Sequence, residues 1–569
     1  MISVSGKKWV EDRVNQNLID KIKQDFNFKE ILAKLIVLRN YDLTEIHNIH
    51  DDLKITNIFN NNSDFIKASD ILINTINNNE YICILGDYDV DGISATSLLI
   101  RFFNHIKQRH FYYIPDREKD GYGASIKIFE KLLLKKPKLI IMLDCGSTSN
   151  DAIEFLNYNN IKSIIIDHHE INKPYPKSNA IINPKKNTDY KEYDYVCATT
   201  LTYFFIDKVV QKTKSKFKLS DFLIYVLLAT VCDVMPLRKF NKIIASNVIK
   251  NFKLEHNLPF KVIFNKFNLK KKLTIDDLGF LIGPIINSGG RLGFSNYGTE
   301  LLISDNLDIL ENKSEQLINL NNKRKKLEKN ILSKIDFKKL NIGNKNVIIY
   351  YNDIIHEGLI GIIASRLKDH FNKPTIVITK SNNTLKASAR STKNYNIGKI
   401  IKILIDMNII EKGGGHNMAA GFSIKKDNLK LLDDFIQKDY LKNNKGFDLV
   451  FKYDSEISCS AINKNFYKEI NKLGPFGNEN SLPIFLIKNV RIFKPILIGG
   501  SHISCIIKPV IGSSIKSICF NSVNTKIGEY LLSYKKEINI IAQITENSFN
   551  NKKSIQLNIK DLFLSANSA

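Results

Sequence analysis

Between Tyr81 and Leu237, fully apolar runs alternate with segments whose apolar residues recur at helical spacing. The apolar runs are predicted to be strands: Ile82–Leu85, Phe111–Ile114, Leu139–Leu143 and Ile161–Ile166. The segments between them are predicted to be helices: Ser94–Ile106, Ile126–Leu134 and Asp151–Asn157. Strands that are apolar on both faces and separated by helices indicate a parallel sheet covered on both sides. This part of the chain is therefore predicted to be an α/β domain.

Acidic residues follow three of these predicted strands. Asp87, Asp89 and Asp91 come after the first strand, Asp144 after the third and Asp167 after the fourth. Parallel sheets bind ligands beyond the carboxyl ends of their strands, and carboxylates this close together repel one another unless a cation neutralises them. Because carboxylate oxygens suit Mg²⁺ or Mn²⁺, the pattern predicts a divalent-cation site. For Asp87–Asp91 alone, a solvated acidic turn is the alternative.

Two adjacent histidines, His168 and His169, follow Asp167. An imidazole can bind a metal ion or orient a substrate or a water molecule, so both are predicted to be functional, whereas a lone loop histidine is more often a surface residue. Asp233 follows the apolar run Leu223–Val231 in a similar way. By itself Asp233 also fits an ordinary aspartate at a helix end.

A second α/β unit is predicted from about residue 346, with strands Val347–Tyr351 and Pro374–Thr379 around a helix Gly361–His370. Small residues flank Arg390, and Gly413, Gly414 and Gly415 precede His416. Glycines let backbone N–H groups approach an anion closely. We therefore expect a tight phosphate pocket here, although a glycine-rich segment by itself is usually an ordinary turn.

The two ends of the chain have other patterns. Residues 1–75 are predicted to be mostly helical, with Trp9 as a packing anchor, and residues 301–340 form a charged, strongly helical segment. From about residue 447, short alternating runs predict a β-barrel. Such a barrel suits an OB-fold that binds single-stranded nucleic acid; a packing or dimerisation domain is the alternative.

Composition narrows the class of partner. The net charge of +25 over 569 residues points to nucleic acid, although coding bias also enriches this chain in Lys. The length predicts two to four domains. No apolar run is long enough to span a membrane, and we expect no secretory signal and no membrane association. The seven cysteines are scattered without a C-x-x-C pair, which predicts reduced thiols and a cytoplasmic location.

The order of the acidic motifs matches a known pattern. DYDVDG, then LDCG at Leu143–Gly146, then DHH and finally Asp233 resemble the DHH phosphoesterase superfamily, and over nearly the whole chain the resemblance is to its single-strand-specific exonucleases. Further matching motifs are GYG at Gly121–Gly123, INSGGRLG at Ile286–Gly293, LNNKRKKLE at Leu320–Glu328, HEGLIGIIASRL at His356–Leu367, GGGHNMAAGFS at Gly413–Ser423 and PFGNENSLPIF at Pro475–Phe485. Ile285 replaces an arginine of the pattern P-R-I-N, which predicts a weaker substrate contact, and GNENSLP is looser than the pattern.

The resemblance implies an α/β fold of several parts. These are an N-terminal helical segment at 1–75, a parallel-sheet DHH domain at 76–300, a connecting helix at 301–340, a smaller α/β DHH-associated substrate-binding domain at 341–440, and an OB-like nucleic-acid-binding β-barrel at 447–566.

The resemblance also implies an activity: metal-dependent hydrolysis of single-stranded DNA in the 5′→3′ direction to 5′-mononucleotides, in DNA repair and recombination. The implied partners are single-stranded DNA, a single-strand-binding protein and a RecQ-type helicase. We expect a monomer, because the basic residues are evenly spread along the chain.

Phosphodiester hydrolysis is well served by two divalent ions, Mn²⁺ or Mg²⁺. Asp87 or Asp89 with His168 or Asp167 would hold the first ion, and Asp91, Asp144 and Asp233 the second; the sequence leaves open which acid serves which ion. The predicted catalytic residues are His169, His168 and Asp167, with His169 orienting the reacting groups. The predicted substrate-binding residues are Arg291, Arg390, Gly414, Gly415 and His416.

Two other readings compete with the exonuclease. A phosphoesterase with the same core could act on short oligonucleotides, cyclic dinucleotides or pyrophosphate, but the segment after Phe447 argues against such shorter relatives. An inactive binding protein on this fold would lack metal ligands, and here the acids and both histidines are present.

Overall fold

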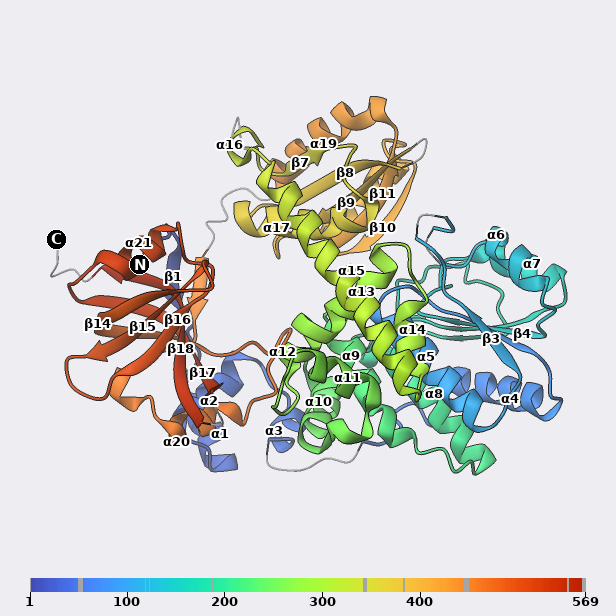
Figure 1. Cartoon of the computed structure of the whole chain (residues 1–569), viewed down its shortest axis with the longest axis horizontal. Helices are drawn as coiled ribbons and strands as arrows, with labels where there is room; N and C mark the ends of the chain where they lie inside the picture. Colours follow the sequence, from blue (N-terminus) through green and yellow to red (C-terminus); the bar gives the residue numbers. More distant parts are fainter. Residues whose placement is uncertain are drawn as a thin grey trace. The chain divides into compact units, whose positions relative to one another are not determined.

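A computed structural model describes residues 2–49, 55–117, 119–121, 123–186, 188–340, 345–381, 384–443, 450–549 and 552–564. The chain divides into two compact units (Figure 1). The α/β unit comprises Thr56–Met235 and Asn251–Phe447, and the barrel unit comprises Met1–Ile55, Pro236–Lys250 and Asp448–Ala569. None of the described helices is long and apolar enough to cross a membrane.

The first sheet of the α/β unit is parallel, as the sequence predicts. Its strands are β2 (Ile82–Leu85), β3 (His110–Tyr113), β4 (Leu139–Leu143), β5 (Lys162–Ile166) and β6 (Ala180–Ile182), in the order β3-β2-β4-β5-β6. The short strand β6 was not predicted. Strand order reverses between β2 and β4, and this switch point is where open α/β sheets bind ligands.

Helices cover both faces of this sheet. In Figure 1, α6 (Ile126–Leu133) and α7 (Asn150–Tyr158) lie on one side, and α4 (Ser63–Asn77), α5 (Val90–His105) and α8 (Ala198–Thr213) lie on the other. Strands β2 and β4 are buried along their whole length. Their apolar side chains are therefore shielded on both faces, which explains why they form uninterrupted apolar runs.

Helices form the middle of the α/β unit. They are α9 (Leu223–Cys232), α11 (Leu258–Lys266), α12 (Ile275–Asp277), a π-helix (Leu278–Ile282), α13 (Gly283–Arg291), α14 (Tyr297–Ile303), α15 (Leu307–Ser333) and α16 (Phe337–Leu340). The 27-residue helix α15 lies in the segment predicted to be a connecting helix and packs against α11, α13 and α14.

The second sheet of the α/β unit is mixed, with the order β10-β11-β9-β8-β7. Its strands are β7 (Ile348–Tyr351), β8 (Thr375–Ser381), β9 (Thr384–Arg390), β10 (Lys412–His416) and β11 (Ala419–Ile424), and its helices are α17 (Ile360–Phe371), α18 (Ile397–Asp406) and α19 (Leu429–Asn443). The glycine run belongs to β10, an exposed edge strand, and not to a turn. Pairing with β11 stabilises these glycines in an extended conformation.

The barrel unit contains a closed β-barrel. Strands β14 (Ile484–Ile498), β15 (His502–Pro509), β16 (Ile515–Cys519), β18 (Lys552–Leu564) and β17 (Ile538–Phe549) pair in that order, and β17 pairs back with β14. The short strand β13 (Ser455–Ile457) adds to β14, and α20 (Lys464–Asn471) and α21 (Lys526–Ser533) accompany the barrel. Closure leaves few unpaired strand edges.

The N-terminal segment belongs largely to this unit. It has the predicted helices α1 (Gln16–Phe26), α2 (Glu30–Leu38) and α3 (Leu43–His47), but it begins with a strand that was not predicted, β1 (Lys8–Glu11), which pairs with β12 (Val450–Tyr453). Trp9 is buried and its indole N–H donates to Asp561, 2.9 Å away, in agreement with its predicted packing role.

The loose motif GNENSLP forms a turn of the barrel unit. The buried Asn480 amide donates to the carbonyls of Leu473 and Pro475, and its oxygen accepts from the Tyr41 hydroxyl. Lys242, on α10 (Lys239–Asn251), donates to the Tyr41 hydroxyl at 3.2 Å and is only 6% exposed. Burial lowers the pKa of Lys242 to about 8, since no carboxylate contacts its amino group within the described chain.

The buried charge on Lys242 predicts a pH-dependent change of stability. Lys242→Met should stabilise the barrel unit at pH 7 by at most about 3 kcal/mol, because the parent protein must hold a desolvated ammonium. The advantage should shrink between pH 8 and about pH 10.5, where the folded lysine has lost its proton and the unfolded one still carries it. Thermal unfolding followed by Trp9, the single tryptophan, measures this difference. A difference that is constant with pH would contradict the prediction.

Candidate active site

The three acids after β2 are placed by the start of helix α5. Asp89 caps this helix: one carboxylate oxygen accepts from the N–H groups of Asp91, at 2.9 Å, and Gly92, at 3.1 Å. Asp87 is 2% exposed. A Cβ atom on Gly92 would lie 2.6 Å from the Asp87 backbone and Cβ, so only glycine lets the chain fold back this tightly. Asp87 and Asp91 are thus buried on either side of the cap.

Asp91 is held by the beginning of helix α8. Its carboxylate accepts from the N–H groups of Ala198 and Thr199 and from the Thr199 hydroxyl, at 2.6–2.8 Å. These donors fix its orientation. Burial, followed by the charge of Asp89, still raises the pKa of Asp91 to about 6.

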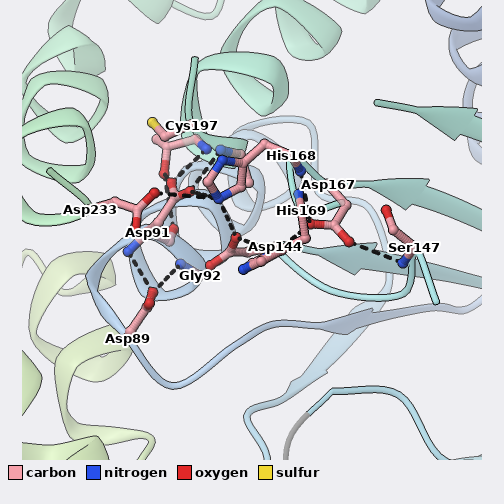
Figure 2. Close-up of polar contacts among 12 residues, drawn as sticks. Asp89, Asp91, Gly92, Asp144, Ser147, Asp167, His168, His169, Cys197 and Asp233 are labelled. Atoms are coloured by element: carbon pink, nitrogen blue, oxygen red, sulfur yellow. Dashed lines mark hydrogen bonds and ion pairs between the residues drawn. The ribbon is translucent and has the colours of Figure 1, made fainter. Parts of the chain in front are cut away.

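His168 lies at the centre of a group of carboxylates (Figure 2). Its Nε2 is 3.3 Å from Asp144, 3.4 Å from Asp233 and 3.7 Å from Asp91. Asp144 follows β4 with a backbone φ of +62°, a conformation that is uncommon outside glycine and that recurs at functional sites. Burial and then the positive charge of His169 lower the pKa of His168 well below its usual value, so at neutral pH it is an unprotonated ligand.

The carboxylates fit a metal site. Buried oxygens of Asp87, Asp144 and Asp233 accept no hydrogen bond from any described residue. Burial and the neighbouring acids raise the pKa of Asp87 to about 8 and those of Asp144 and Asp233 well above their usual value. Such groups are stable as anions only beside a cation, and clustered carboxylate oxygens with imidazole nitrogen match a hard divalent ion.

The ligand atoms fall into overlapping groups, within each of which they lie less than 4.8 Å apart: Asp87 with Asp89 and Asp144, Asp91 with His168 and Asp233, and Asp144 with His168 and His169. The sequence paired His168 with Asp87 or Asp89, and Asp144 with Asp91 and Asp233. The structure exchanges these two partners. Asp144 and His168 each belong to two groups, so each is placed to serve two neighbouring ions.

Asp167 contacts donors rather than the other candidate ligands. One of its oxygens accepts from the N–H groups of His168 and His169 and from His169 Nδ1, at 2.7–3.1 Å, and the other accepts from the Ser147 N–H at 3.0 Å. Burial would raise the pKa of Asp167, but His169 holds it well below its usual value. The predicted metal-ligand role does not fit these surroundings, because the donors already use the lone pairs of the carboxylate.

Asp167 instead determines the state of His169. Burial lowers the pKa of His169, but the adjacent Asp167 carboxylate outweighs it and raises the pKa to about 9. His169 is therefore charged at neutral pH, with Nδ1 directed at Asp167 and 2.7 Å from it. This pair resembles the carboxylate–imidazole arrangements that fix a tautomer in active sites.

Arginines gather on the other side of the site. Arg291 ends α13 and donates to the Gly358 carbonyl, and Arg390 ends β9 and donates to the Ser388 hydroxyl and the Ala389 carbonyl. Neither forms an ion pair with any described residue. Burial, together with the charge of Arg117, lowers the pKa of both, that of Arg291 to about 10. Buried cations without counter-ions form an anion-binding site.

The second sheet also brings His416 to the first. The ring of His416, at the end of β10, lies 6.1 Å from the ring of His169, and its Nδ1 is 3.8 Å from Glu170. Gly414 and Gly415 precede it on the exposed strand. The predicted substrate-binding residues thus lie on two elements, α13 and the β9–β10 end of the second sheet.

Three regions of the chain match known domains. Residues 81–230 match the DHH family, N-terminal domain, residues 344–441 match the DHHA1 domain, and residues 453–561 match the RecJ OB domain. The chain belongs to the DHH family. The DHH motif itself is Asp167-His168-His169.

Three curated DHH-family relatives carry the name single-stranded-DNA-specific exonuclease RecJ. That of Haemophilus influenzae is 28% identical over 86% of this chain and 89% of the relative. Those of Bacillus subtilis and Escherichia coli are 25% and 27% identical, over 99% and 87% of this chain and 71% and 90% of the relative. The crystal structure of RecJ in complex with Mn²⁺ from Thermus thermophilus is similar in fold, with a TM-score of 0.81 at 19% identity over 98% of this chain and 79% of that chain.

The structure adds residues to the DHH site that sequence reasoning missed. Asn183, after β6, donates to the Ser147 hydroxyl and the His169 carbonyl, and Lys185 pairs with Glu170 at 3.1 Å. The short apolar run that ends at Ile182 was the available signal. Arg117 lies over the Tyr88 ring and 4.0 Å from Glu357. Nothing in its polar segment distinguished Arg117 from a surface residue.

Two predicted features behave differently. Ile285, the departure from the family pattern, is fully buried, so it packs in the core and its replacement of arginine removes no contact at the surface of the site. The expected weaker substrate contact therefore has no support. Tyr122 of the GYG motif lies outside the described residues.

Removing a ligand should change metal-dependent stability. Asp144→Asn should unfold at the same or a higher temperature in EDTA, because it relieves repulsion among buried acids, and should lose most of the stabilisation by Mn²⁺, which for a filled site is roughly 2.7 kcal/mol at 100 times the dissociation constant. Asp167→Asn is the matched control and should destabilise the protein in EDTA while retaining stabilisation by Mn²⁺. The reverse pattern would contradict the roles given to the two residues.

The glycines of β10 offer a paired test. A Cβ on Gly414 meets nothing within 4 Å, whereas one on Gly415 would lie 2.5 Å from Ala420. Gly414→Ala should therefore keep the unfolding temperature but weaken binding of a single-stranded oligonucleotide, and Gly415→Ala should lower the unfolding temperature. Fluorescence anisotropy and thermal unfolding measure the two effects. Unchanged binding by Gly414→Ala would remove this residue from the substrate contacts.

Proposed function

We propose that the protein is a metal-dependent exonuclease that hydrolyses the phosphodiester bonds of single-stranded DNA. The observation that carries the proposal is the meeting, in one unit, of a carboxylate–imidazole group fit for divalent ions with buried arginines that have no counter-ion. A phosphodiester anion complements both. The names of the curated relatives and the RecJ OB match support single-stranded DNA as the substrate.

Each residue has a task in the proposed reaction. Asp87, Asp89, Asp91, Asp144, Asp233 and His168 would hold Mn²⁺ or Mg²⁺. Two such ions neutralise phosphoryl oxygens, lower the pKa of an attacking water and stabilise the leaving oxygen. Arg291 and Arg390 would bind the substrate phosphate, joined by Arg117, and His416 with the backbone of β10 would contact the strand.

His169 is the proposed catalytic group that faces the substrate. Its Nδ1 is directed at Asp167, so Nε2 is the nitrogen left to donate a hydrogen bond or a proton to the reacting phosphate. The raised pKa keeps this imidazole charged at neutral pH. Asp167 is a positioning residue, because it acts through His169.

We further infer the arrangement predicted from the sequence. The DHH catalytic domain would span 76–300, the connecting helix 301–340, the DHH-associated domain 341–440 and the OB-like domain 447–566, after the segment 1–75. The domain matches at 81–230, 344–441 and 453–561 support these limits. Residue 447 and residues 565 and 566 lie outside the described chain.

The biological setting is also a proposal. We infer 5′→3′ digestion to 5′-mononucleotides during DNA repair and recombination, by a monomer that works with a single-strand-binding protein and a RecQ-type helicase. The seven free cysteines, of which six are buried, support the predicted reducing cytoplasm.

The activity is tested with a 5′-labelled single-stranded oligonucleotide and Mn²⁺. Mononucleotides should be released from the labelled end, and Asp89→Ala and His168→Ala should reduce the rate by roughly 100-fold or more, since even partners outside the ligand shell cost 10- to 100-fold. Lys553→Gln, a charge change in the barrel unit, serves as the control.

The same assay separates the alternatives. Blunt duplex DNA should be degraded far more slowly than the single strand. Failure to release mononucleotides from a long strand would end the proposal, and equal rates on duplex and single strand would end its strand specificity.

A further inference from the structure

A cavity of about 390 Å³ lies in the barrel unit, away from the acids and histidines of the α/β unit. It opens where two barrel strands part: β16 ends at Cys519, one residue after its last pairing partner of β18, and β18 continues to Leu564. Farther along, the N-terminal segment covers β18, with Val4 N–H donating to the Leu562 carbonyl and Ser5 to Asp561. The cavity is therefore a gap left between β16 and the N-terminal segment.

The charged side chains that line this cavity are all positive. Lys526 and Lys560 contribute to its wall, no acidic side chain does, and neither lysine forms an ion pair with any described residue. Burial lowers the pKa of Lys560, which means that its amino group is partly removed from water without compensation by a carboxylate. The exposed lysines of the same unit differ, since Lys452, Lys488 and Lys553 are each paired with an acid. An anion in the cavity would supply the missing counter-charge.

The remaining wall offers a hydrogen-bond acceptor and an aromatic ring. The side-chain oxygen of Asn558 is buried and accepts no hydrogen bond from any described residue, a state that costs free energy until a donor arrives. Phe520 is 53% exposed, although large aromatic side chains are usually buried, and it makes a T-shaped contact with His502 at 5.2 Å. An anion alone would satisfy the lysines but neither of these groups.

We propose that the cavity binds one nucleotide unit, with the phosphate on Lys526 and Lys560, the base against Phe520 and an N–H of the base or an O–H of the sugar on Asn558. Nucleobases stack on aromatic side chains. The volume lies in the range of small-ligand sites. The same chemistry is present in a free deoxynucleoside monophosphate and in one residue of a DNA strand, and the experiment separates these two sources.

The test is photolabelling of the full chain with 8-azido-dAMP. The chain carries Asp89→Ala and is kept in EDTA, so that hydrolysis does not interfere. Label should appear in peptides that contain residues 519–527 or 558–560. Lys560→Gln should weaken labelling about 5- to 50-fold, and Phe520→Ala by a similar factor, whereas Phe520→Tyr should restore it because the ring is kept. Thermal unfolding verifies that the variants are folded.

Lys553→Gln is the matched control, because it makes the same charge change on the same strand outside the cavity. Its labelling should equal that of the parent. An azido-adenine within an oligonucleotide is the second probe: labelling by the free nucleotide identifies a mononucleotide site, and labelling by the oligonucleotide alone identifies a strand contact. Absence of label from these peptides with both probes, or labelling that survives Lys560→Gln and Phe520→Ala, overturns the proposal.

Discussion

The burial of several carboxylates at one edge of a parallel sheet is the constraint on which the rest of this protein depends. Asp87, Asp91, Asp144 and Asp233 converge around His168 with raised pKa values, and three of them direct oxygens at no hydrogen-bond donor of the described chain. Repulsion among such groups would open the site unless cations neutralise them. The surrounding fold is built to hold them together nevertheless.

That support is local and specific. Gly92 permits the tight return of the chain over Asp87, the start of α8 supplies three donors to Asp91, and Asp144 has a left-handed backbone directly after β4. Each device holds one acid in place without using every oxygen it has. The stability given up at this edge is recovered by the fully buried strands β2 and β4 behind it.

The arginines complete an arrangement of opposite charges. Arg291 reaches the second sheet through Gly358, whose Cβ position lies 2.1 Å from the Arg291 carbonyl, so only glycine allows the two parts to approach this closely. Arg390 comes from that second sheet. The substrate phosphate would thus be contacted from two elements that pack directly against each other. Such packing gives a defined geometry, which loops alone would not provide.

Sequence patterns predicted the strands, the helices and the acids of this site, because apolar runs and their acidic ends reflect burial along one chain segment. They also predicted a barrel, and Trp9 as an anchor. They did not predict which acid lies beside which histidine, that Asp167 contacts donors instead of a metal, or that Arg117 and Asn183 belong to the site. Those facts depend on distances between separate elements. The glycines of β10 and the strand β1 were misread for the same reason, since pairing with a distant strand overrides local preference. The sequence by itself determined which groups carry charge and where the chain turns; only tertiary packing decided which of those charges meet, because the energy of a buried charge depends on its neighbours in space.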